Sequence, residues 1–183
     1  GGKERRFVEL LKGIKASSTI DFEIVVMNEN IHYQEIFSLN NKIHYLIRKR
    51  KKDFFVFGKF YKICKGYKPD IVQCWDSMTA VYAIPACKLL KIKLINGMVT
   101  NAPNKSPIFD KIQFRRKLTF PFSDIIIGNS KAGLLAYKTP LNKSSVVYNG
   151  YNFKRNENLL AEEIIRKQLN ISTKYIVGMV ATF

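Results

Sequence analysis

The sequence predicts a protein of the α/β class, built on a doubly wound parallel sheet. Short apolar runs rich in β-branched residues alternate with longer stretches in which apolar side chains recur at helical spacing. Such runs are typical of strands that are buried on both faces, as they are in parallel sheets. Strands that alternate with helices of about 10–15 residues indicate βαβ units. With 183 residues, 46% of them hydrophobic, the chain can form one full core, or one domain and part of another.

The expected elements follow one another along the chain without an internal repeat. Apolar residues at helical spacing between Phe7 and Ile14 predict a first helix. A proline introduces one of the later strands, and acidic and basic residues at opposite ends of the last helix suit the helix dipole. The expected strands cover residues 22–27, 43–47, 69–75, 92–99, 124–130, 144–150 and 174–183, and the later helices cover about 53–65, 77–90, 108–119 and 157–169.

The formal net charge of +17 is the strongest compositional feature. It predicts attraction to a polyanionic partner, which could be nucleic acid, an anionic membrane face or a phosphorylated ligand. Cys64, Cys74 and Cys87 are odd in number and widely spaced, so we expect reduced, mostly buried thiols of a cytosolic protein. No apolar run approaches the roughly 18–20 residues of a membrane span, and no signal peptide is recognised. We expect a cytoplasmic protein that is peripheral at the inner face of the plasma membrane.

A basic and aromatic segment, residues 48–68, surrounds the start of the second helix. We expect Phe54, Phe57, Tyr61 and Cys64 to share one face of this helix, with lysines elsewhere. One interpretation is a core-facing helix with a solvated side, and the other is a surface that meets anionic lipid, with aromatic rings at headgroup level. The cations of this expected patch are Arg48, Lys49, Arg50, Lys51, Lys52, Lys59 and Lys62, extended by Arg115 and Arg116 of a second basic segment.

Ligands of doubly wound sheets bind at the carboxyl ends of the strands, so the loops that follow each strand are the candidate sites. Each also has a purely local interpretation. Asp76 and Ser130 are typical helix N-caps, Trp75 suits a core, and a Gly-Gly pair is often only a turn. The candidate residues are Gly1 and Gly2, Trp75, Asp76 and Ser77, Thr100 and Asn101, Asn129 and Ser130, and Asn149 and Gly150.

Several familiar sites are absent from the sequence. It contains neither the phosphate loop of the nucleotide triphosphatases nor a complete GxGxxG dinucleotide motif. No DxD pair or cluster of His, Cys and carboxylate residues indicates a metal site. His44 falls in an expected strand and suits a structural role, whereas His32 falls in a loop and suits solvation. No Ser/His/Asp arrangement is recognisable.

Five segments, taken in order, resemble the amino-terminal domain of family 4 glycosyltransferases, which have the GT-B fold. The resemblance covers nearly the whole chain, and the order and spacing of the segments make it more specific than any one alone. The segments are "GGKERRFVELLKGI" (1–14), "PDIVQCWDSMTAVYAIPACKLL" (69–90), "DIIIGNSKAGLLAY" (124–137), "SSVVYNGYN" (144–152) and "IVGMVATF" (176–183).

The resemblance implies a Rossmann-like domain, one half of a GT-B fold, in an enzyme of the retaining type. Such an enzyme moves a sugar from a nucleotide-sugar donor to a glycan or lipid-linked acceptor, here in surface polysaccharide or lipopolysaccharide biosynthesis. No metal or other cofactor is expected, and nucleic acid is not expected as a partner. The family holds the donor mainly in its carboxy-terminal domain, so these 183 residues alone are expected to be inactive. The alternatives are a non-catalytic basic module that binds RNA or a membrane surface, and a GT-B nucleotide-sugar epimerase.

The resemblance also assigns roles to matching residues. Gly1 and Gly2 match the loop that approaches the donor diphosphate, and Arg5 or Arg6 could assist it. The catalytic residue is unassigned, because the histidine that many relatives carry near Thr100 and Asn101 is missing here. Trp75, Asp76 and Ser77 match the acceptor-facing loop, Thr100 and Asn101 its neighbourhood, and Asn129 and Ser130 a loop of the interdomain cleft.

The resemblance also divides the chain. Residues 1–155 are expected to form the amino-terminal domain without its first strand, 156–172 a linker and helix, and 173–183 the first strand of a truncated donor-binding domain. The missing strand would belong in the middle of the sheet, ahead of Gly1. Either the last strand fills that position, within the chain or by exchange with another copy, or the sequence is part of a longer protein.

Overall fold

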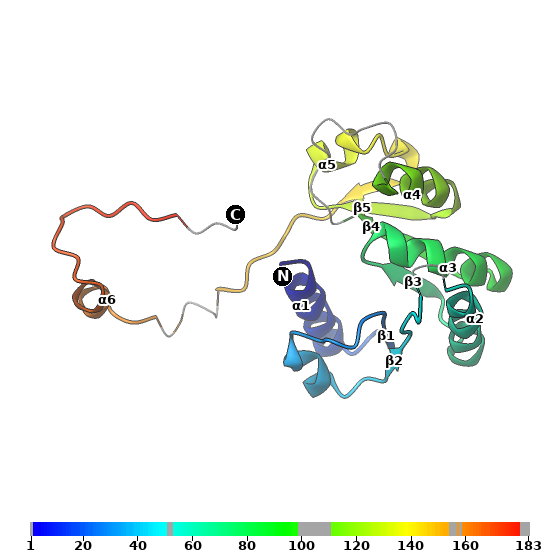
Figure 1. The fold of residues 1–183 in the computed structure, drawn as a ribbon, viewed down its shortest axis with the longest axis horizontal. Helices are drawn as coiled ribbons and strands as arrows, with labels where there is room; N and C mark the ends of the chain where they lie inside the picture. Colours follow the sequence, from blue (N-terminus) through cyan, green and yellow to red (C-terminus); the bar gives the residue numbers. More distant parts are fainter. Residues whose placement is uncertain (1, 51–52, 99–110, 154–156, 158, 180–183) are drawn as a thin grey trace. The chain divides into compact units, whose positions relative to one another are not determined.

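A computed structural model describes residues 2–50, 53–98, 111–153, 157 and 159–179. The chain divides into a larger unit, residues 1–149, and a smaller unit, residues 150–183. The larger unit consists of parallel strands and helices that alternate along the chain (Figure 1). The predicted α/β class with a Rossmann-like parallel sheet is therefore confirmed.

The strands of the larger unit form two parallel sheets. The first joins β1 (Ile24–Val26) to β2 (Ile43–Tyr45). The second has the order β3-β4-β5-β6, with Ile71 opposite Lys93 at one end of its first pair. Among the described strands, β1 and β3 each pair along one edge only. The members of the second sheet are β3 (Ile71–Cys74), β4 (Lys93–Met98), β5 (Ile125–Gly128) and β6 (Ser144–Val146).

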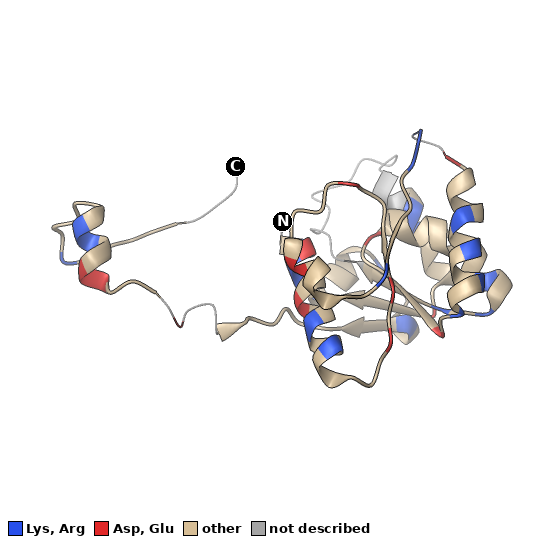
Figure 2. Ribbon diagram, turned by 90° about the horizontal axis from the view of Figure 1, so that it is seen from below, with Lys and Arg blue, Asp and Glu red and all other residues tan. Residues whose placement is uncertain are grey.

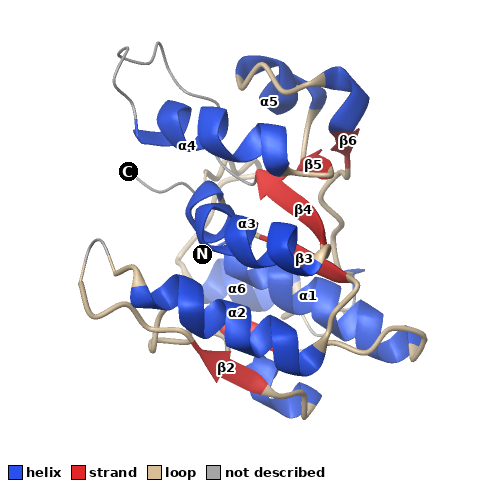
Figure 3. Ribbon diagram, turned by 90° about the vertical axis from the view of Figure 1, so that its right-hand side faces the viewer, coloured by secondary structure: helices blue, strands red, loops and turns tan. Residues whose placement is uncertain are grey.

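Helices lie on the strands as the alternating pattern predicted. Figure 3 shows α2, α3 and α4 side by side over the strands. Short 3-10 turns complete the connections, namely η1 (Gln34–Leu39), η2 (Phe120–Phe122) and η3 (Leu141–Lys143). The α-helices of the larger unit are α1 (Gly2–Ser17), α2 (Phe55–Tyr67), α3 (Ser77–Leu90), α4 (Lys111–Thr119) and α5 (Lys131–Ala136).

Adjacent residues of β1 point into different cores, which shows that this sheet is covered on both faces. Ile24 belongs to a cluster with Val8 and Leu11 of α1. Val25 packs instead against the larger cluster built by α2, α3, β3 and β4. Because side chains alternate along a strand, the two clusters lie on opposite faces. This is the doubly wound arrangement that the sequence predicted.

The buried face of α2 differs from the expected one. Val56, Phe60 and Cys64, spaced four residues apart, are buried, whereas Phe54 is 75% exposed. Phe54 precedes the first helical residue, Phe55, and so lies outside the stripe that packs on α3. The expected face, which included Phe54 and left out Phe60, is therefore wrong at its first turn.

The smaller unit contains α6 (Glu162–Gln168), which lies inside the predicted helix 157–169. The strand predicted over 174–183 is wrong for residues 174–179, which form no strand. Tyr175 and Met179 are largely exposed, and Val177 is fully exposed. An apolar run becomes a strand only when another strand accepts and donates its backbone hydrogen bonds, and these residues have no such pairing. Residues 180–183 lie outside the described part. Within that part, no helix is long and apolar enough to cross a membrane.

Candidate functional site

The first two turns of α1 meet the loops that follow β3 and β6. The Lys3 ammonium donates to the Asp76 carboxylate at 2.8 Å, and the Arg6 guanidinium donates to the side-chain oxygen of Asn149. The Phe7 ring lies edge-on to Trp75, with ring centroids 5.3 Å apart. These contacts bring the carboxyl ends of two non-adjacent strands to one helix N-terminus. This is the edge at which ligands of doubly wound sheets bind.

Asp76 is held by two elements at once. It is the N-cap of α3, and its carboxylate accepts the backbone N–H of Thr79 at 2.8 Å. In return, the backbone N–H of Asp76 donates to the Thr79 hydroxyl. Burial opposes ionisation, but hydrogen bonds from Lys3 and Thr79 lower the pKa of Asp76 below its usual value. The residue is therefore a carboxylate near neutral pH, and its charge is already shared between a helix terminus and a cation.

Trp75 and Ser77 flank Asp76 but differ in their surroundings. Ser77 is buried as the first residue of α3, whereas Trp75 is half-buried against α1. The Trp75 ring thus packs against α1, which agrees with the interpretation of Trp75 as a packing residue, and part of its surface stays accessible to solvent. Of this predicted acceptor-facing loop, the structure keeps Trp75 and Asp76 accessible at the sheet edge.

Asn129 and Ser130 follow β5, at the same edge of the sheet. The Ser130 hydroxyl accepts the backbone N–H of Gly133 at 3.0 Å and caps α5. The local interpretation of Ser130 as an N-cap is therefore confirmed. Thr100, Asn101 and Gly1 lie outside the described residues.

Gly2 begins α1, and within the described residues a Cβ placed on it would meet no atom within 4 Å beyond its chain neighbours and its own helix. Packing within the described chain therefore does not require glycine at this position. Gly97 differs, because a Cβ there would lie 2.6 Å from the carbonyl oxygen of Cys74 on the neighbouring strand β3. The glycine of β4 is thus needed for strand packing, whereas the one at α1 is exposed and free of such contact.

Lys3 and Phe7 did not stand out in the sequence, although both contact the site. They are four residues apart on α1 and so lie on the same face of the helix. Their position just after the two glycines is the sequence feature that could have marked them as site residues. What the sequence did not show is that this face meets the loop at 75–77, more than seventy residues later.

A hollow of about 560 Å³ lies at the carboxyl ends of β1 and β2. One side is formed by Met27, Asn28, Glu29 and Asn30, which follow β1. The other is formed by residues 47–50, which follow β2 and include the cations Arg48, Lys49 and Arg50. Three predicted patch residues therefore lie at the carboxyl edge of the two-stranded sheet, whereas Asp76 and Asn149 follow strands of the four-stranded sheet.

The other predicted patch residues are divided among different surroundings. Lys59 and Lys62 are exposed on α2, and Arg115 is half-buried on α4. The Arg116 guanidinium donates to the backbone carbonyl of Tyr137, so this side chain joins α4 to the end of α5. Lys51 and Lys52 lie outside the described residues.

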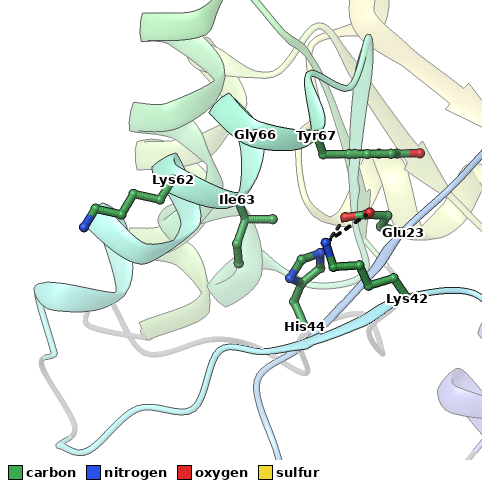
Figure 4. Close-up of a pocket in the computed structure, with 7 residues that line it drawn as sticks. All are labelled: Glu23, Lys42, His44, Lys62, Ile63, Gly66 and Tyr67. Atoms are coloured by element: carbon green, nitrogen blue, oxygen red, sulfur yellow. Dashed lines mark hydrogen bonds and ion pairs between the residues drawn. The ribbon is translucent and has the colours of Figure 1, made fainter.

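A second hollow, of about 460 Å³, surrounds His44 at some distance from these loops (Figure 4). Glu23 accepts from His44 and pairs with Lys42 at 3.6 Å, and Tyr67 closes the hollow from the end of α2. Glu23 precedes β1, so this hollow lies toward the amino ends of the first two strands. His44 has the structural surroundings that its place in a strand predicted, and His32 is exposed.

No three His, Cys, Asp or Glu residues gather into a possible metal site within the described parts of the chain. No protein-family model and no curated protein matches the sequence. Solved structures do share the fold. HepE of Anabaena, solved in complex with UDP, superposes with a TM-score of 0.72 at 14% identity, over 94% of this chain and 47% of HepE. A glycosyltransferase of Rickettsia africae gives 0.65 at 20% identity, over 95% of this chain and 47% of its own.

The lipopolysaccharide outer core galactosyltransferase WaaB gives a TM-score of 0.60 at 21% identity, over 84% of this chain and 43% of WaaB. A UDP-N-acetylglucosamine 2-epimerase shares the fold as well, with a TM-score of 0.57 at 16% identity, over 82% of this chain and 49% of its own. The chain thus spans about half the length of the solved proteins that it matches. At these identities, the likeness shows the Rossmann-like fold of one half of such GT-B proteins.

Proposed function

We propose that these residues form the acceptor-side half of a GT-B glycosyltransferase that transfers a sugar from a nucleotide-sugar donor to a glycan or lipid-linked acceptor. The observation that carries the proposal is the meeting of the α1 N-terminus with the loops after β3 and β6, through Lys3–Asp76 and Arg6–Asn149. A helix N-terminus with basic side chains attracts a diphosphate. The open space at Gly2 allows a ligand to approach the backbone there.

Arg6 is the cation that we assign to the donor phosphates. Lys3 already neutralises a carboxylate, whereas the described partners of Arg6, Asn149 and the carbonyl of Gly2, carry no charge. The described contacts of Arg6 therefore leave its positive charge at the edge of the sheet without a carboxylate to balance it. A fixed cation there would stabilise the charge that develops on a departing nucleoside diphosphate. We assign Trp75 and Asp76 to the acceptor side, and we propose transfer without a metal and with retention at the anomeric carbon.

The structural neighbours support a nucleotide sugar as donor. HepE has been solved with UDP, with UDP and glucose, and with UDP-glucose. The lipopolysaccharide galactosyltransferase supports the proposed acceptor class, a surface glycan or its lipid-linked precursor. We also propose a place at the inner face of the plasma membrane. Because the neighbours are about twice as long, we propose that activity requires residues beyond these 183.

The epimerase is the second candidate, because a protein of that activity shares the fold. A transferase needs an acceptor, whereas an epimerase converts a nucleotide sugar by itself. The non-catalytic basic module explains the net charge but not the ordered contacts of α1 with two loops. Acceptor dependence therefore separates the two enzymatic candidates in one assay.

The test uses the product of the whole reading frame that encodes these residues, incubated with radiolabelled UDP-sugars and a lipid-linked glycan extract. We expect label to move to the acceptor, and Arg6→Gln to lower kcat/KM by roughly tenfold or more. Lys65→Gln, an exposed cation at the far end of α2, serves as the control and should leave the rate unchanged. Conversion of the UDP-sugar without acceptor would establish the epimerase instead. Failure to bind any nucleotide sugar, whether linked to UDP or to another nucleotide, would overturn both.

A further inference from the structure

We propose that one corner of the larger unit docks on an anionic lipid bilayer. The docking corner consists of Arg48, Lys49 and Arg50, which follow β2, and of Phe54 and Phe55, which begin α2. It combines three cations with two exposed aromatic side chains. That combination suits the boundary between charged headgroups and acyl chains.

The two phenylalanines are largely open to solvent. Phe54 is 75% exposed and Phe55 is 84% exposed, although the next residue of the helix, Val56, is fully buried. The Phe54 ring stacks on Phe57 with centroids 6.4 Å apart, and Phe57 in turn packs on Tyr82 of α3. Phe54 is thereby supported by the core while its own surface faces out. Phenylalanine has no polar tip that water could solvate, so two adjacent exposed rings favour an apolar partner.

Asp53 holds the cations and the aromatic pair together. Its nearly buried carboxylate accepts the backbone N–H of Lys49 at 2.9 Å and that of Phe55 at 3.1 Å. One side chain therefore fixes the end of the basic segment to the start of the helix. The relation between the two halves of the docking corner does not depend on residues 51 and 52.

The charge of the docking corner is only partly compensated. Its three cations outnumber the nearly buried Asp53 carboxylate, which accepts backbone N–H groups instead of pairing with a cationic side chain. No salt bridge joins Arg48, Lys49 or Arg50 to an acidic side chain among the residues that the structure describes. Glu29 is the one acidic residue of the hollow that they line. Figure 2 shows basic residues on this connection and along α2 directly after it. An anionic membrane surface attracts such a cluster, and each cation near the surface adds to the binding.

The location of the docking corner relates it to the candidate site. The corner follows the carboxyl end of β2 directly, and α3 begins with the Asp76 cap at the carboxyl end of β3. Both strands belong to parallel pairs of the same unit. The docking corner and the acceptor-side loop each follow the carboxyl end of a strand, although the two strands belong to different sheets. A docked corner would hold the larger unit, and with it the acceptor-side loop, at the lipid surface. This relation rests on the proposed function, but lipid binding itself does not require sugar transfer.

The test is co-sedimentation of the full chain with vesicles of phosphatidylcholine alone, or of phosphatidylcholine mixed with phosphatidylglycerol, without any nucleotide sugar. We expect binding only to the anionic vesicles, and loss of binding as salt is raised. Lys49→Glu/Arg50→Glu should weaken binding more than tenfold, since two cations are reversed. Phe54→Ser/Phe55→Ser should weaken it as well while the net charge stays the same.

The control variants change residues at the carboxyl end of α3, outside the docking corner. Lys88→Glu/Lys91→Glu changes the net charge by the same amount as the corner variant, and Leu89→Ser removes an apolar side chain that is 74% exposed. Both should bind anionic vesicles like the parent, and thermal unfolding checks that every variant is folded. If Lys88→Glu/Lys91→Glu lost as much vesicle binding as the corner variant, net charge alone would explain the attraction, and the docking corner would be overturned. Equal binding to neutral vesicles, no binding to either, or binding of an RNA oligonucleotide in place of vesicles would overturn it too. Because no sugar is transferred in this experiment, a failed transferase assay leaves its outcome unaffected.

Discussion

The ammonium group of Lys3 lies 2.8 Å from the carboxylate of Asp76, across 73 positions of sequence. The same carboxylate caps α3 through the backbone N–H of Thr79. One acidic side chain therefore joins the first turns of two helices at the carboxyl edge of the sheet. A substitution at Asp76 affects both the ion pair with Lys3 and the N-cap of α3. Alanine removes both interactions, whereas asparagine removes mainly the ion pair.

We expect Asp76→Ala to lower the free energy of unfolding by about 1–2 kcal/mol, because α3 loses its N-cap. Asp76→Asn keeps an acceptor for Thr79 and loses mainly the ion pair with Lys3. This partly exposed pair contributes less than about 1 kcal/mol, so Asp76→Asn and Lys3→Gln should each have a smaller effect. Urea unfolding of the three variants measures this order, and an Asn variant as unstable as the Ala variant would contradict it.

The pH dependence of that pair follows from the lowered pKa of Asp76. A carboxyl whose pKa is lower in the folded state stabilises the protein above its unfolded pKa, about 3.9, and this stability is lost as the pH falls through the folded value. Lys3→Gln removes one cause of the lowering. The stability difference between parent and Lys3→Gln should therefore be largest above pH 4 and shrink in acid, as measured by urea unfolding across this range.

Gly97→Ala should destabilise the protein markedly, since the new Cβ would lie 2.6 Å from the Cys74 carbonyl oxygen. That oxygen belongs to the backbone of β3, so relief requires the strands to shift. Gly13→Ala is the matched control. Gly13 is exposed within α1 and a Cβ there meets no atom within 4 Å, so alanine should stabilise by about 0.5–1 kcal/mol. Thermal unfolding compares the two, and equal midpoints would refute the strand-packing role.

Gly2→Ala should not lower the thermal unfolding midpoint, because its Cβ would meet no atom of the described chain. If a diphosphate approaches the backbone there, the same substitution should weaken UDP binding by the product of the whole reading frame. Calorimetric titration with UDP measures this, with Gly13→Ala as the variant whose affinity stays at the parent value. Unchanged affinity in both variants would remove Gly2 from the donor loop.

The three cysteines should be unreactive in the folded protein. All are buried and free, and burial raises the pKa of Cys64 to about 11 and that of Cys87 to about 12, with Cys74 also raised. Ellman's reagent at pH 8 should therefore detect almost no thiol until guanidinium is added, when all three should react. Rapid reaction of one thiol in the native protein would contradict the buried arrangement.

The same raised pKa values predict alkaline destabilisation. A thiol that stays neutral in the folded state, but ionises when unfolded near pH 8.5, contributes stability that is complete below about pH 8.5. That stability is lost as the pH rises toward the folded pKa values of about 11 and 12. Cys64→Ala/Cys87→Ala should flatten the decline between about pH 9 and 11 in urea unfolding, even if the variant is less stable at neutral pH.

The sequence by itself determined the α/β class, the parallel strands and the burial of the three cysteines. These follow from local spacing, since a run of β-branched residues or an apolar repeat restricts the backbone wherever the segment lies. The caps at Asp76 and Ser130 were predictable for the same reason, because donor and acceptor are three residues apart. Such features need no knowledge of the rest of the chain.

Only the tertiary structure decided which distant groups meet. Lys3 with Asp76, Arg6 with Asn149, and the Asp53 clamp at the start of α2 depend on how helices cross strands, which periodicity does not encode. The apolar run at 174–179 shows the converse, since a strand-forming pattern stays unpaired without a neighbouring strand. Local pattern limits what a segment can become, and its partners in space determine what it does become.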